Sequence, residues 1–491
     1  MHLLTAKEMY EADRLTIQSG ITGCQLMSQA GKFVADAIEN LNIGPCKTVV
    51  LAGTGNNGGD AFVAAELLNN RNYHVELYLS GEQKDLGGDA ALMAKRYSGK
   101  IKETKSIDLN GVDLIIDGLI GAGLDRPVKD ELAQLILKVN ASKIPVVAVD
   151  IPSGVSSDTG KVMGVAIMAT KTVTFFRPKP GHFLYPGRAH CGNLQCRDIG
   201  IQPRVLKNIS PKTALNTKEV WQSAFSSSQP TIHKYNKGCA IVLAGDNLMN
   251  GASSLSANAA LRAGAGLVIY AATEETSNPH PKLSQAVMKE NVGRETSLAD
   301  LINKRRINAA LIGPGWPVNI STREKTLELL ECPANIIIDA GAVSSFEEQP
   351  NELIKKLANS GNIKDIIITP HEAEFKRLFG NLIEQHGKLL AAKIAAEQSQ
   401  SCIILKGADT VIADKDGRVV INQNAPSSLA TAGTGDVLAG IVTGFIANQL
   451  PAFEAASAAV FIHAECAASI GSNLISDDLL VRLSDEIRKL S

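Results

Sequence analysis

Two glycine-rich stretches place a carboxylate beside a turn that could hold a phosphate. The first is Gly433-Thr434-Gly435-Asp436, which is followed by an apolar run with helical spacing. Free backbone N–H groups at the start of a helix favour an anion, and a carboxylate there can take the proton of a hydroxyl that attacks phosphorus. An ordinary helix start can carry the same residues. Alone, this stretch therefore indicates either a phosphoryl-transfer site or a simple glycine turn.

The second stretch, residues 53–60, follows a short apolar segment at 47–52 and precedes an expected helix at 61–68. A strand, a glycine loop and a helix in this order are typical of a mononucleotide-binding βα unit. The spacing departs from G-x-G-x-x-G because Asn56 and Asn57 stand inside the loop. Two amides and a carboxylate are more than a turn needs, so we expect a ligand-binding loop.

Expected strands and helices alternate in both halves of the chain, which predicts α/β domains with parallel, doubly wound sheets. In such sheets ligands bind at the carboxyl ends of the strands. Several of these ends carry Asp117, Asp150, His371 or Lys406, although each residue could instead cap a turn or helix. The expected strands are 47–52, 74–79, 112–117 and 145–150, then 240–243, 266–271, 309–312, 335–339, 365–369 and 401–405, with three closing helices from Asp436 onward.

The alternation stops between residues 204 and 236, where Ser226-Ser227-Ser228-Gln229-Pro230 has the composition of a linker. We therefore expect two domains, 1–220 and 226–491. Two helices ahead of the first strand could cover a sheet edge or pair two subunits, and we expect a homo-oligomer.

Composition favours a small-molecule ligand. The 491 residues include 49 basic and 50 acidic side chains without a long run of one sign, so nucleic acid and membrane surfaces are not expected partners. Eight scattered cysteines without a C-x-x-C pair favour free thiols in a reducing compartment. The N-terminus lacks the pattern of a signal peptide, and the apolar run after Asp436 is shorter than a membrane span. We expect a cytoplasmic protein.

Together, these motifs resemble those of the bifunctional NAD(P)H-hydrate repair enzymes. The first half, with residues 55–60 and 150–154, resembles the NAD(P)H-hydrate epimerase domain, a Rossmann-like doubly wound sheet. The second half, with residues 259–268, 369–371, 406–407 and 433–436, resembles the ADP-dependent NAD(P)H-hydrate dehydratase domain of ribokinase-like α/β/α fold. The resemblance implies repair of NADH and NADPH that have added water at C6 of the nicotinamide ring. The epimerase would interconvert the R and S hydrates, and the dehydratase would convert the S hydrate to NAD(P)H, releasing AMP and phosphate.

For the first half, the resemblance implies that Asp150 is the acid or base at C6. It also implies a potassium ion at Asn57, Asp117 and Ser153, whose oxygen atoms suit a hard cation. The implied contacts with the hydrate are Asn56, Asn57, Gly58, Gly59, Asp60, Gly121, Ala122, Gly123, Leu124, Asp125, Arg126, Pro127 and Asp150.

For the second half, the resemblance implies that Asp436 deprotonates the C6 hydroxyl and that ADP binds with Mg²⁺. The implied hydrate contacts are Ala252, Gly315, His371 and Asp436, and the implied ADP contacts are Lys406, Gly407, Ala408, Asp409, Thr410 and Gly435. The chain departs from the family pattern at Tyr235, Trp316 and Gly341.

Two other interpretations stay open at this point. One is a ribokinase-like small-molecule kinase fused to a non-catalytic dinucleotide-binding module. The other is a binding protein without catalysis, which would leave Asp150 and Asp436 without a chemical task. NADH recovery from its hydrate in the presence of ADP would separate these interpretations from the repair enzyme.

Overall fold

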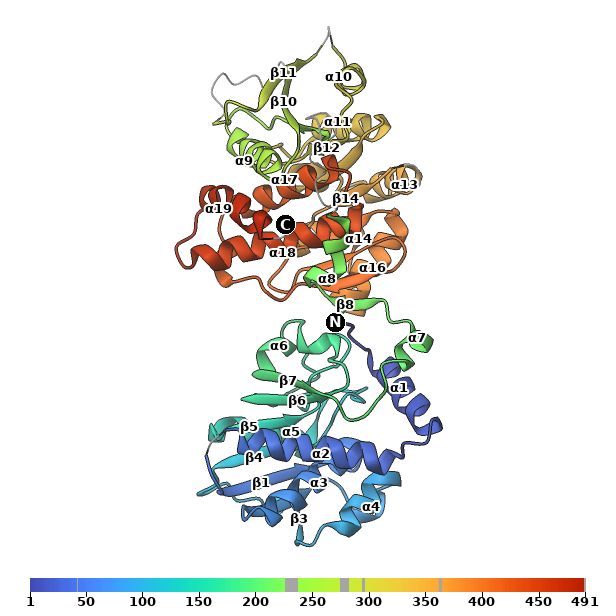
Figure 1. The fold of residues 1–491 in the computed structure, drawn as a ribbon, viewed down its shortest axis with the longest axis vertical. Coiled ribbons are helices and arrows are strands. Elements are labelled where there is room, and N and C mark those ends of the chain that lie inside the picture. Colours follow the sequence, from blue (N-terminus) through green and yellow to red (C-terminus); the bar gives the residue numbers. More distant parts are fainter. Residues whose placement is uncertain (42, 226–236, 274–281, 294–295, 362–363, 490–491) are drawn as a thin grey trace. The chain divides into compact units, whose positions relative to one another are not determined.

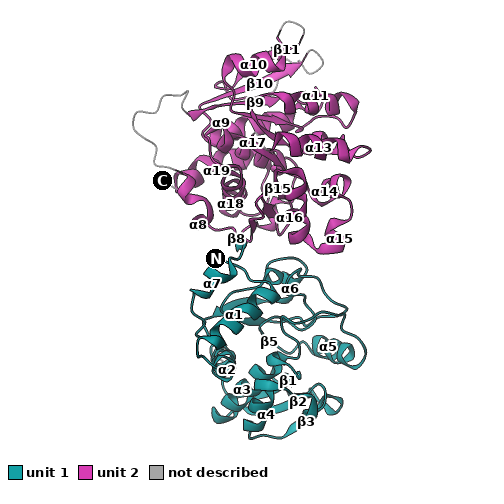
Figure 2. Ribbon diagram, turned by 90° about the vertical axis from the view of Figure 1, so that its right-hand side faces the viewer, with its two compact units in different colours: residues 1–214 teal, residues 215–491 magenta. Residues whose placement is uncertain are grey.

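The computed structural model describes residues 1–491 except 42, 226–236, 274–281, 294–295, 362–363 and 490–491. The chain divides into two compact units, residues 1–214 and 215–491 (Figures 1 and 2). The expected linker at Ser226 to Pro230 lies outside the described residues.

Residues 215–220, which the sequence assigns to the first domain, fall in the second unit. Asn216 donates hydrogen bonds from Nδ2 to Asn422 Oδ1 at 3.0 Å and to Ser457 O at 2.8 Å. The buried ring of Trp221 lies 5.6 Å from that of Phe461. These contacts involve residues more than 200 positions away in the sequence, so local composition could not reveal them.

The first unit contains a seven-stranded, fully parallel sheet in the order β3-β2-β1-β4-β5-β6-β7. Its strands are β1 (Lys47–Ala52), β2 (His74–Leu79), β3 (Ile101–Glu103), β4 (Leu114–Gly118), β5 (Val146–Val149), β6 (Lys171–Phe175) and β7 (Asn193–Arg197). Its helices are α1 (Ala6–Gln18), α2 (Gly23–Glu39), α3 (Asn56–Asn70), α4 (Gly88–Arg96), α5 (Asp130–Ser142), α6 (Gly187–His190) and α7 (Val205–Ile209).

Each face of this sheet has its own core, because successive side chains of a strand point to opposite faces. On β4, Leu114 and Ile116 pack into the core shared with α2 and α3. Ile115 points the other way, into the core that contains Ile136 and Val139 of α5. Helices therefore cover both faces, which confirms the expected doubly wound arrangement.

The second unit contains a ten-stranded sheet in the order β11-β10-β9-β12-β13-β14-β15-β16-β17-β8, parallel from β11 to β15 and antiparallel where β16 joins β15 and β17. Its strands are β8 (Thr213–Leu215, which spans the boundary between the two units), β9 (Cys239–Leu243), β10 (Leu267–Thr273), β11 (Met288–Val292), β12 (Ala309–Ile312), β13 (Asn335–Ile338), β14 (Ile366–Ile368), β15 (Cys402–Leu405), β16 (Val411–Ala413) and β17 (Val419–Ile421). Its helices are α8 (Lys218–Trp221), α9 (Asn250–Arg262), α10 (Leu298–Arg305), α11 (Ile320–Glu331), α12 (Ala340–Ser344), α13 (Pro350–Ser360), α14 (Glu372–Phe379), α15 (Leu382–His386), α16 (Lys388–Ser399), α17 (Thr434–Ala447), α18 (Ala452–Ile470) and α19 (Ser476–Arg488).

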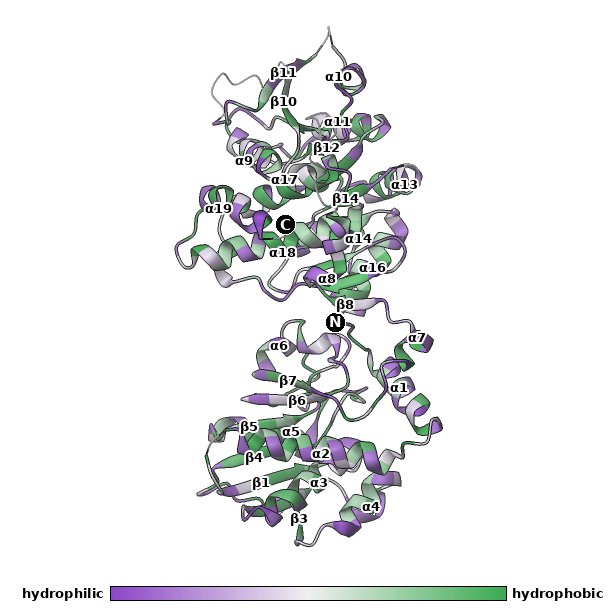
Figure 3. Ribbon diagram, viewed as in Figure 1, coloured by the Kyte–Doolittle hydropathy of each residue, from purple (hydrophilic) through white to green (hydrophobic). Residues whose placement is uncertain are grey.

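The α17 helix is buried along most of its length and is coloured as hydrophobic in Figure 3. Glycines allow it to approach α9 closely, because a Cβ atom at Gly440 would lie 2.3 Å from the carbonyl oxygen of Ser256. One helix of the described residues, α18, is long and apolar enough to cross a membrane, and 67% of its apolar window is buried inside the protein. The α18 helix also packs against α17.

Candidate active sites

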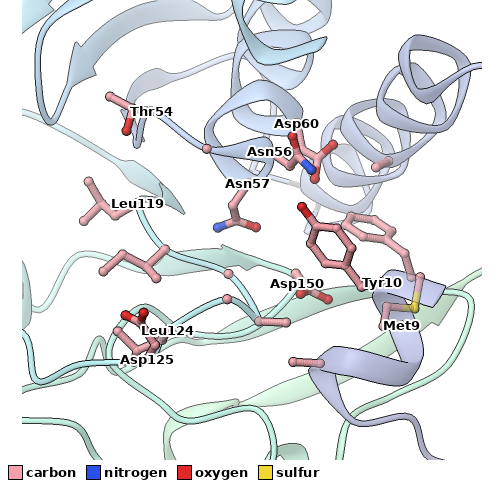
Figure 4. Close-up of a pocket in the computed structure, with 18 of the residues that line it drawn as sticks. Met9, Tyr10, Thr54, Asn56, Asn57, Asp60, Leu119, Leu124, Asp125 and Asp150 are labelled. Carbon is pink, nitrogen blue, oxygen red and sulfur yellow. The ribbon is translucent and has the colours of Figure 1, made fainter. Parts of the chain in front are cut away.

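A cavity of about 920 Å³ in the first unit brings together most of the residues expected to bind a hydrate. It receives Asn56, Asn57 and Asp60 from α3 and Asp150 from the carboxyl end of β5. Figure 4 shows these side chains around one space, together with Tyr10 of α1. The loop after β4 supplies the remaining expected residues, Gly121, Ala122, Gly123, Leu124, Asp125, Arg126 and Pro127.

Gly58 and Gly59 are not part of the cavity wall, and their glycine identity has a packing reason. A Cβ atom at Gly58 would lie 1.9 Å from the carbonyl oxygen of Gly53. One at Gly59 would lie 2.5 Å from the sulfur of Met27. Both glycines let the start of α3 press against β1 and α2, so they position Asn56, Asn57 and Asp60.

The α3 helix begins at Asn56, five residues earlier than expected, so the asparagines belong to its first turn. The first helical hydrogen bond runs from Gly59 N to Gly55 O at 3.1 Å, and no side chain caps the helix. The N–H groups of the three preceding residues therefore have no partner within the helix. An uncapped helix start beside a cavity is suited to a pyrophosphate.

Asp150 is held by residues that the sequence did not single out. Its Oδ1 accepts a hydrogen bond from Thr174 Oγ1 at 2.8 Å and forms an ion pair with Lys179 Nζ. His182 Nε2 lies 2.9 Å from the Asp150 carbonyl oxygen, while its Nδ1 accepts from Lys179 N at 2.9 Å. These contacts fit a neutral imidazole protonated on Nε2, and burial lowers the pKa of His182 to about 4.

The acidic side chains of this cavity have different proton affinities. Burial alone would raise the pKa of Asp150, but the Lys179 ammonium lowers it below its ordinary value. Burial raises the pKa of Asp60 well above its ordinary value, and the neighbouring carboxylates of Asp150 and Asp13 raise it further. Burial also raises the pKa of Asp13 to about 6. The cavity therefore pairs one carboxyl group of lowered pKa, Asp150, with one of raised pKa, Asp60.

The three expected potassium ligands provide an oxygen-rich group with a buried negative charge. Asp117 is fully buried and accepts from Ser153 Oγ at 2.5 Å and from Ser153 N at 2.8 Å. Burial raises its pKa to about 6, and the hydrogen bonds from Ser153 and from the Leu119 N–H only partly oppose this effect. Asn57 Nδ2 is buried without a hydrogen-bond partner among the described residues, and rotating the amide would present its oxygen instead. This donor set fits a hard cation.

In the second unit, the start of α17 forms another uncapped helix N-terminus. Gly433 has φ of 83°, a left-handed conformation that glycine adopts without strain. The first helical hydrogen bond joins Val437 N to Gly433 O at 3.1 Å. The N–H groups of Thr434, Gly435 and Asp436 are thus free of helical partners and can bind an anion.

Asp436 lies among charged groups at this helix start. Burial raises its pKa to about 7, the carboxylates of Asp339 and Glu374 add to this, and Lys406 partly opposes them. Lys406 Nζ donates to Asp339 Oδ1 at 2.7 Å, and a Cβ atom at Gly435 would lie 3.6 Å from the same Nζ. The structure therefore brings together Lys406, Gly435 and Asp436. A carboxylate with a pKa near 7 is well matched to a general base at neutral pH.

The other residues of the second unit that are expected to contact the hydrate are Ala252, Gly315 and His371. A Cβ atom at Gly315 would lie 3.5 Å from that of Ala252, so these two residues are adjacent. His371 caps α14, since its Nδ1 accepts from Ala373 N at 3.1 Å and Glu374 N at 3.2 Å. About half of its side chain is exposed, and its Nε2 lies 3.5 Å from Glu374 Oε1.

A hydrogen bond within the loop and an ion pair with α16 hold residues 406–410 in place. Thr410 Oγ1 donates to Gly407 O at 2.9 Å, and Asp409 Oδ1 accepts from Lys388 Nζ at 2.6 Å. Asp409 is therefore committed to an ion pair with α16, which shapes the loop that carries Lys406 and Ala408.

Two of the three departures from the family pattern lie next to each other. Trp316 is buried and donates from Nε1 to Leu243 O at 3.2 Å. A Cβ atom at Gly341 would lie 2.1 Å from the carbonyl oxygen of Trp316, so glycine leaves room for this backbone. Tyr235 lies outside the described residues.

Sequence reasoning missed Lys179, His182 and Asp13 in the first unit and His463 in the second. Lys179 and His182 follow β6, and the alternating segment Thr172-Val173-Thr174-Phe175 was the available signal for that strand. His463 is buried and lies close enough to the Thr434 backbone to hydrogen bond, and burial lowers its pKa to about 4.

Polar and glycine-rich loops at the carboxyl ends of parallel strands define the class of these units, which are α/β units of nucleotide-binding type. Residues 23–181 match the family model of the YjeF-related protein N-terminus, and residues 240–489 match that of NAD(P)H-hydrate dehydratase. The chain belongs to the family of bifunctional NAD(P)H-hydrate repair enzymes, and the resemblance seen in its motifs is confirmed.

Individual relatives match nearly the whole chain. The bifunctional NAD(P)H-hydrate repair enzyme Nnr of Moorella thermoacetica is 32% identical, with 100% of this chain and 97% of the relative covered. That of Coxiella burnetii is 31% identical, with 97% of each chain covered. The solved ADP/ATP-dependent NAD(P)H-hydrate dehydratase from Bacillus subtilis, co-crystallised with ATP/Mg²⁺, is 26% identical and covers 56% of this chain and 98% of its own, with a TM-score of 0.45.

Proposed function

We propose that this protein repairs hydrated NADH and NADPH through two reactions at separate sites. The first unit interconverts the R and S hydrates. The second unit uses ADP to convert the S hydrate to NAD(P)H, releasing AMP and phosphate. The observation that carries the proposal is Asp436, a carboxyl with a pKa of about 7 beside free helix N–H groups and Lys406.

Dehydration needs a better leaving group than hydroxide, and phosphoryl transfer from ADP supplies one. Asp436 accepts the proton of the C6 hydroxyl as its oxygen attacks the terminal phosphorus of ADP. The N–H groups of Thr434 and Gly435, with the Lys406 ammonium, stabilise the negative charge on the transferred group. Loss of the proton at C5 and of phosphate at C6 then forms the C5=C6 bond of the dihydronicotinamide.

Mg²⁺ is expected to enter with ADP, because it binds phosphate oxygens and a few carboxylates. The carboxylates of Asp339 and Glu374 lie near Asp436 and are oxygen ligands of the kind that Mg²⁺ accepts. When bound, the ion would neutralise phosphate charge, while Asp436 and Lys406 keep their own roles.

For the first unit, we assign epimerisation at C6 to the cavity that contains Asp150. Lys179 keeps Asp150 ionised, so this residue can accept a proton. The uncapped start of α3 suits the pyrophosphate of the dinucleotide. Potassium at Asn57, Asp117 and Ser153 would compensate the buried charge of Asp117 and steady the loop that begins at Leu119, whose N–H contacts Asp117 Oδ1 at 3.3 Å.

The substrates are small molecules, namely NADH hydrate, NADPH hydrate and ADP. All eight cysteines are free thiols, which supports the expected reducing, cytoplasmic location. Nucleic acid and membranes are not among the proposed partners, and the expected homo-oligomer stays a prediction.

The test incubates the purified full chain with NADH hydrate and ADP and follows the absorbance of reduced nicotinamide. Recovery of NADH that depends on ADP supports the proposal. A kinase would phosphorylate an added acceptor without forming NADH, and a binding protein would leave both hydrate and ADP unchanged. Either of those results would contradict the repair function.

A further inference from the structure

The cavity of the first unit holds more carboxyl groups than one acid or base requires. Asp13 comes from α1, Asp60 from α3 and Asp150 from the end of β5, and all three line the cavity. Asp60 and Asp150 are labelled in Figure 4. Lys179 pairs with Asp150. Of the ion pairs formed between described residues, none includes Asp13 or Asp60. The α1 helix also precedes residues 23–181, the range that matches the family model.

This arrangement separates a proton donor from a proton acceptor. Lys179 pairs with Asp150 and leaves Asp13 and Asp60 without an ion pair among the described residues, which favours the neutral, protonated form of these two carboxyl groups. Lys179 lowers the pKa of Asp150, whereas burial and the neighbouring carboxylates of Asp150 and Asp13 raise the pKa of Asp60. Two carboxyl groups with opposite protonation states in one site are the usual basis for an acid and a base.

We infer that Asp60 is the proton donor and Asp150 the proton acceptor for inversion at C6, and that Asp13 is a positioning residue that keeps Asp60 protonated. The inference rests on the proposed epimerase function. In Figure 4, the carboxyl group of Asp60 comes from α3 and that of Asp150 lies below it, at the end of β5. The two groups therefore enter the cavity from different elements.

The reaction would proceed in two steps with balanced atoms and charges. As the C6–O bond breaks, its electron pair leaves with oxygen, which takes the Asp60 proton and departs as water. The N1 lone pair forms an N1=C6 double bond at the same time. Water then adds to the opposite face of C6, the double-bond pair returns to N1, and the released proton passes to Asp150. The net result is inversion and transfer of one proton between carboxyls, which solvent in the cavity resets.

Several charged groups could influence this proton transfer. Lys179 and His182 face Asp150, and Asp13 faces Asp60. The rest of the cavity wall carries Asp89 on α4 and Asp125, Arg126, Lys129 and Asp130 beside α5. Activity that needs ionised Asp150 and protonated Asp60 should be bell-shaped in pH, with Asp60 setting the alkaline limb.

The experiment compares the full-length wild type with Asp60→Asn, Asp13→Asn and the exposed control Asp85→Asn, using pure R hydrate without nucleotide. Chromatography measures the R/S ratio with time between pH 5 and 10, and circular dichroism checks the fold. Asp60→Asn should slow epimerisation by about 10²- to 10⁴-fold. Asp13→Asn should move the alkaline limb to lower pH, because removing a neighbouring negative charge lowers the pKa of Asp60. Asp85→Asn should match the wild type.

A folded Asp60→Asn variant that epimerises at the wild-type rate, or that keeps the alkaline limb, overturns the inference. Should this variant fail to fold, Asp13→Asn decides the matter, since an unmoved alkaline limb also overturns it. A wild type that leaves R hydrate unchanged gives a different result, because it contradicts the proposed epimerase function itself.

Discussion

Replacing Asp436 with asparagine should stop dehydration while leaving the first unit active. Asparagine keeps the size of the side chain but cannot accept the proton of the C6 hydroxyl. Loss of a general base typically lowers the rate by about 10²- to 10⁴-fold. Asp150 belongs to the other unit, so the R and S hydrates should equilibrate at the normal rate.

The raised pKa of Asp436 also predicts how the dehydration rate and the stability of the second unit change with pH. A pKa of about 7 means that the base is half ionised at pH 7, so the wild-type rate should rise with pH and level off above this value. An acid whose pKa is raised by folding lowers stability as pH rises from the unfolded to the folded value. The change from 3.8 to about 7 corresponds to up to about 4 kcal/mol. Above pH 7, Asp436→Asn should therefore increase the free energy of unfolding of the second unit by a part of this amount.

The assay supplies a mixture of hydrate epimers with ADP and follows both the R/S ratio and the recovery of NADH. Denaturant unfolding at pH 5 and pH 8 measures the stability effect, which should be larger at pH 8. Asp485→Asn, an exposed change on α19, is the matched control and should alter neither quantity. Wild-type recovery of NADH by Asp436→Asn would refute the reasoning and leave Asp436 as a simple helix-start residue.

Three further predictions concern the two units and the nucleotide. Residues 1–214 alone should interconvert R and S hydrates without nucleotide, because this unit has its own sheet and cores; an inactive but folded fragment would contradict this assignment. Lys179→Met should move the acid limb of epimerisation to higher pH, since loss of the cation raises the pKa of Asp150, and an unchanged pH profile would argue against the ion pair. ADP should support NADH recovery better than ATP, and equal turnover with purified ATP would show this preference to be wrong.

The sequence determined the local elements because their signals lie within a few residues. The expected strands at 47–52, 74–79 and 309–312 coincide with β1, β2 and β12. The three closing helices from the start of α17 are also confirmed. Long apolar runs and glycine turns decide such elements locally. The short strands β3, β16 and β17 were missed, because three residues carry too little periodicity to be recognised, and the five-residue strands β6, β7 and β11 were missed as well.

The sequence also placed Asp150 and Asp436 at strand and helix ends, but only the tertiary structure decided their chemistry. Lys179 pairs with Asp150, which lies 29 positions earlier in the sequence. Asp13, on a helix ahead of the first strand, raises the pKa of Asp60 by charge repulsion. Proton affinity depends on burial and on charges that the fold brings close, and neither quantity is encoded in local spacing. Tertiary packing also gives Gly58 and Gly59 a role that the sequence did not show, because a Cβ atom at either position would clash with a neighbour, while their expected contacts with the hydrate stay a prediction.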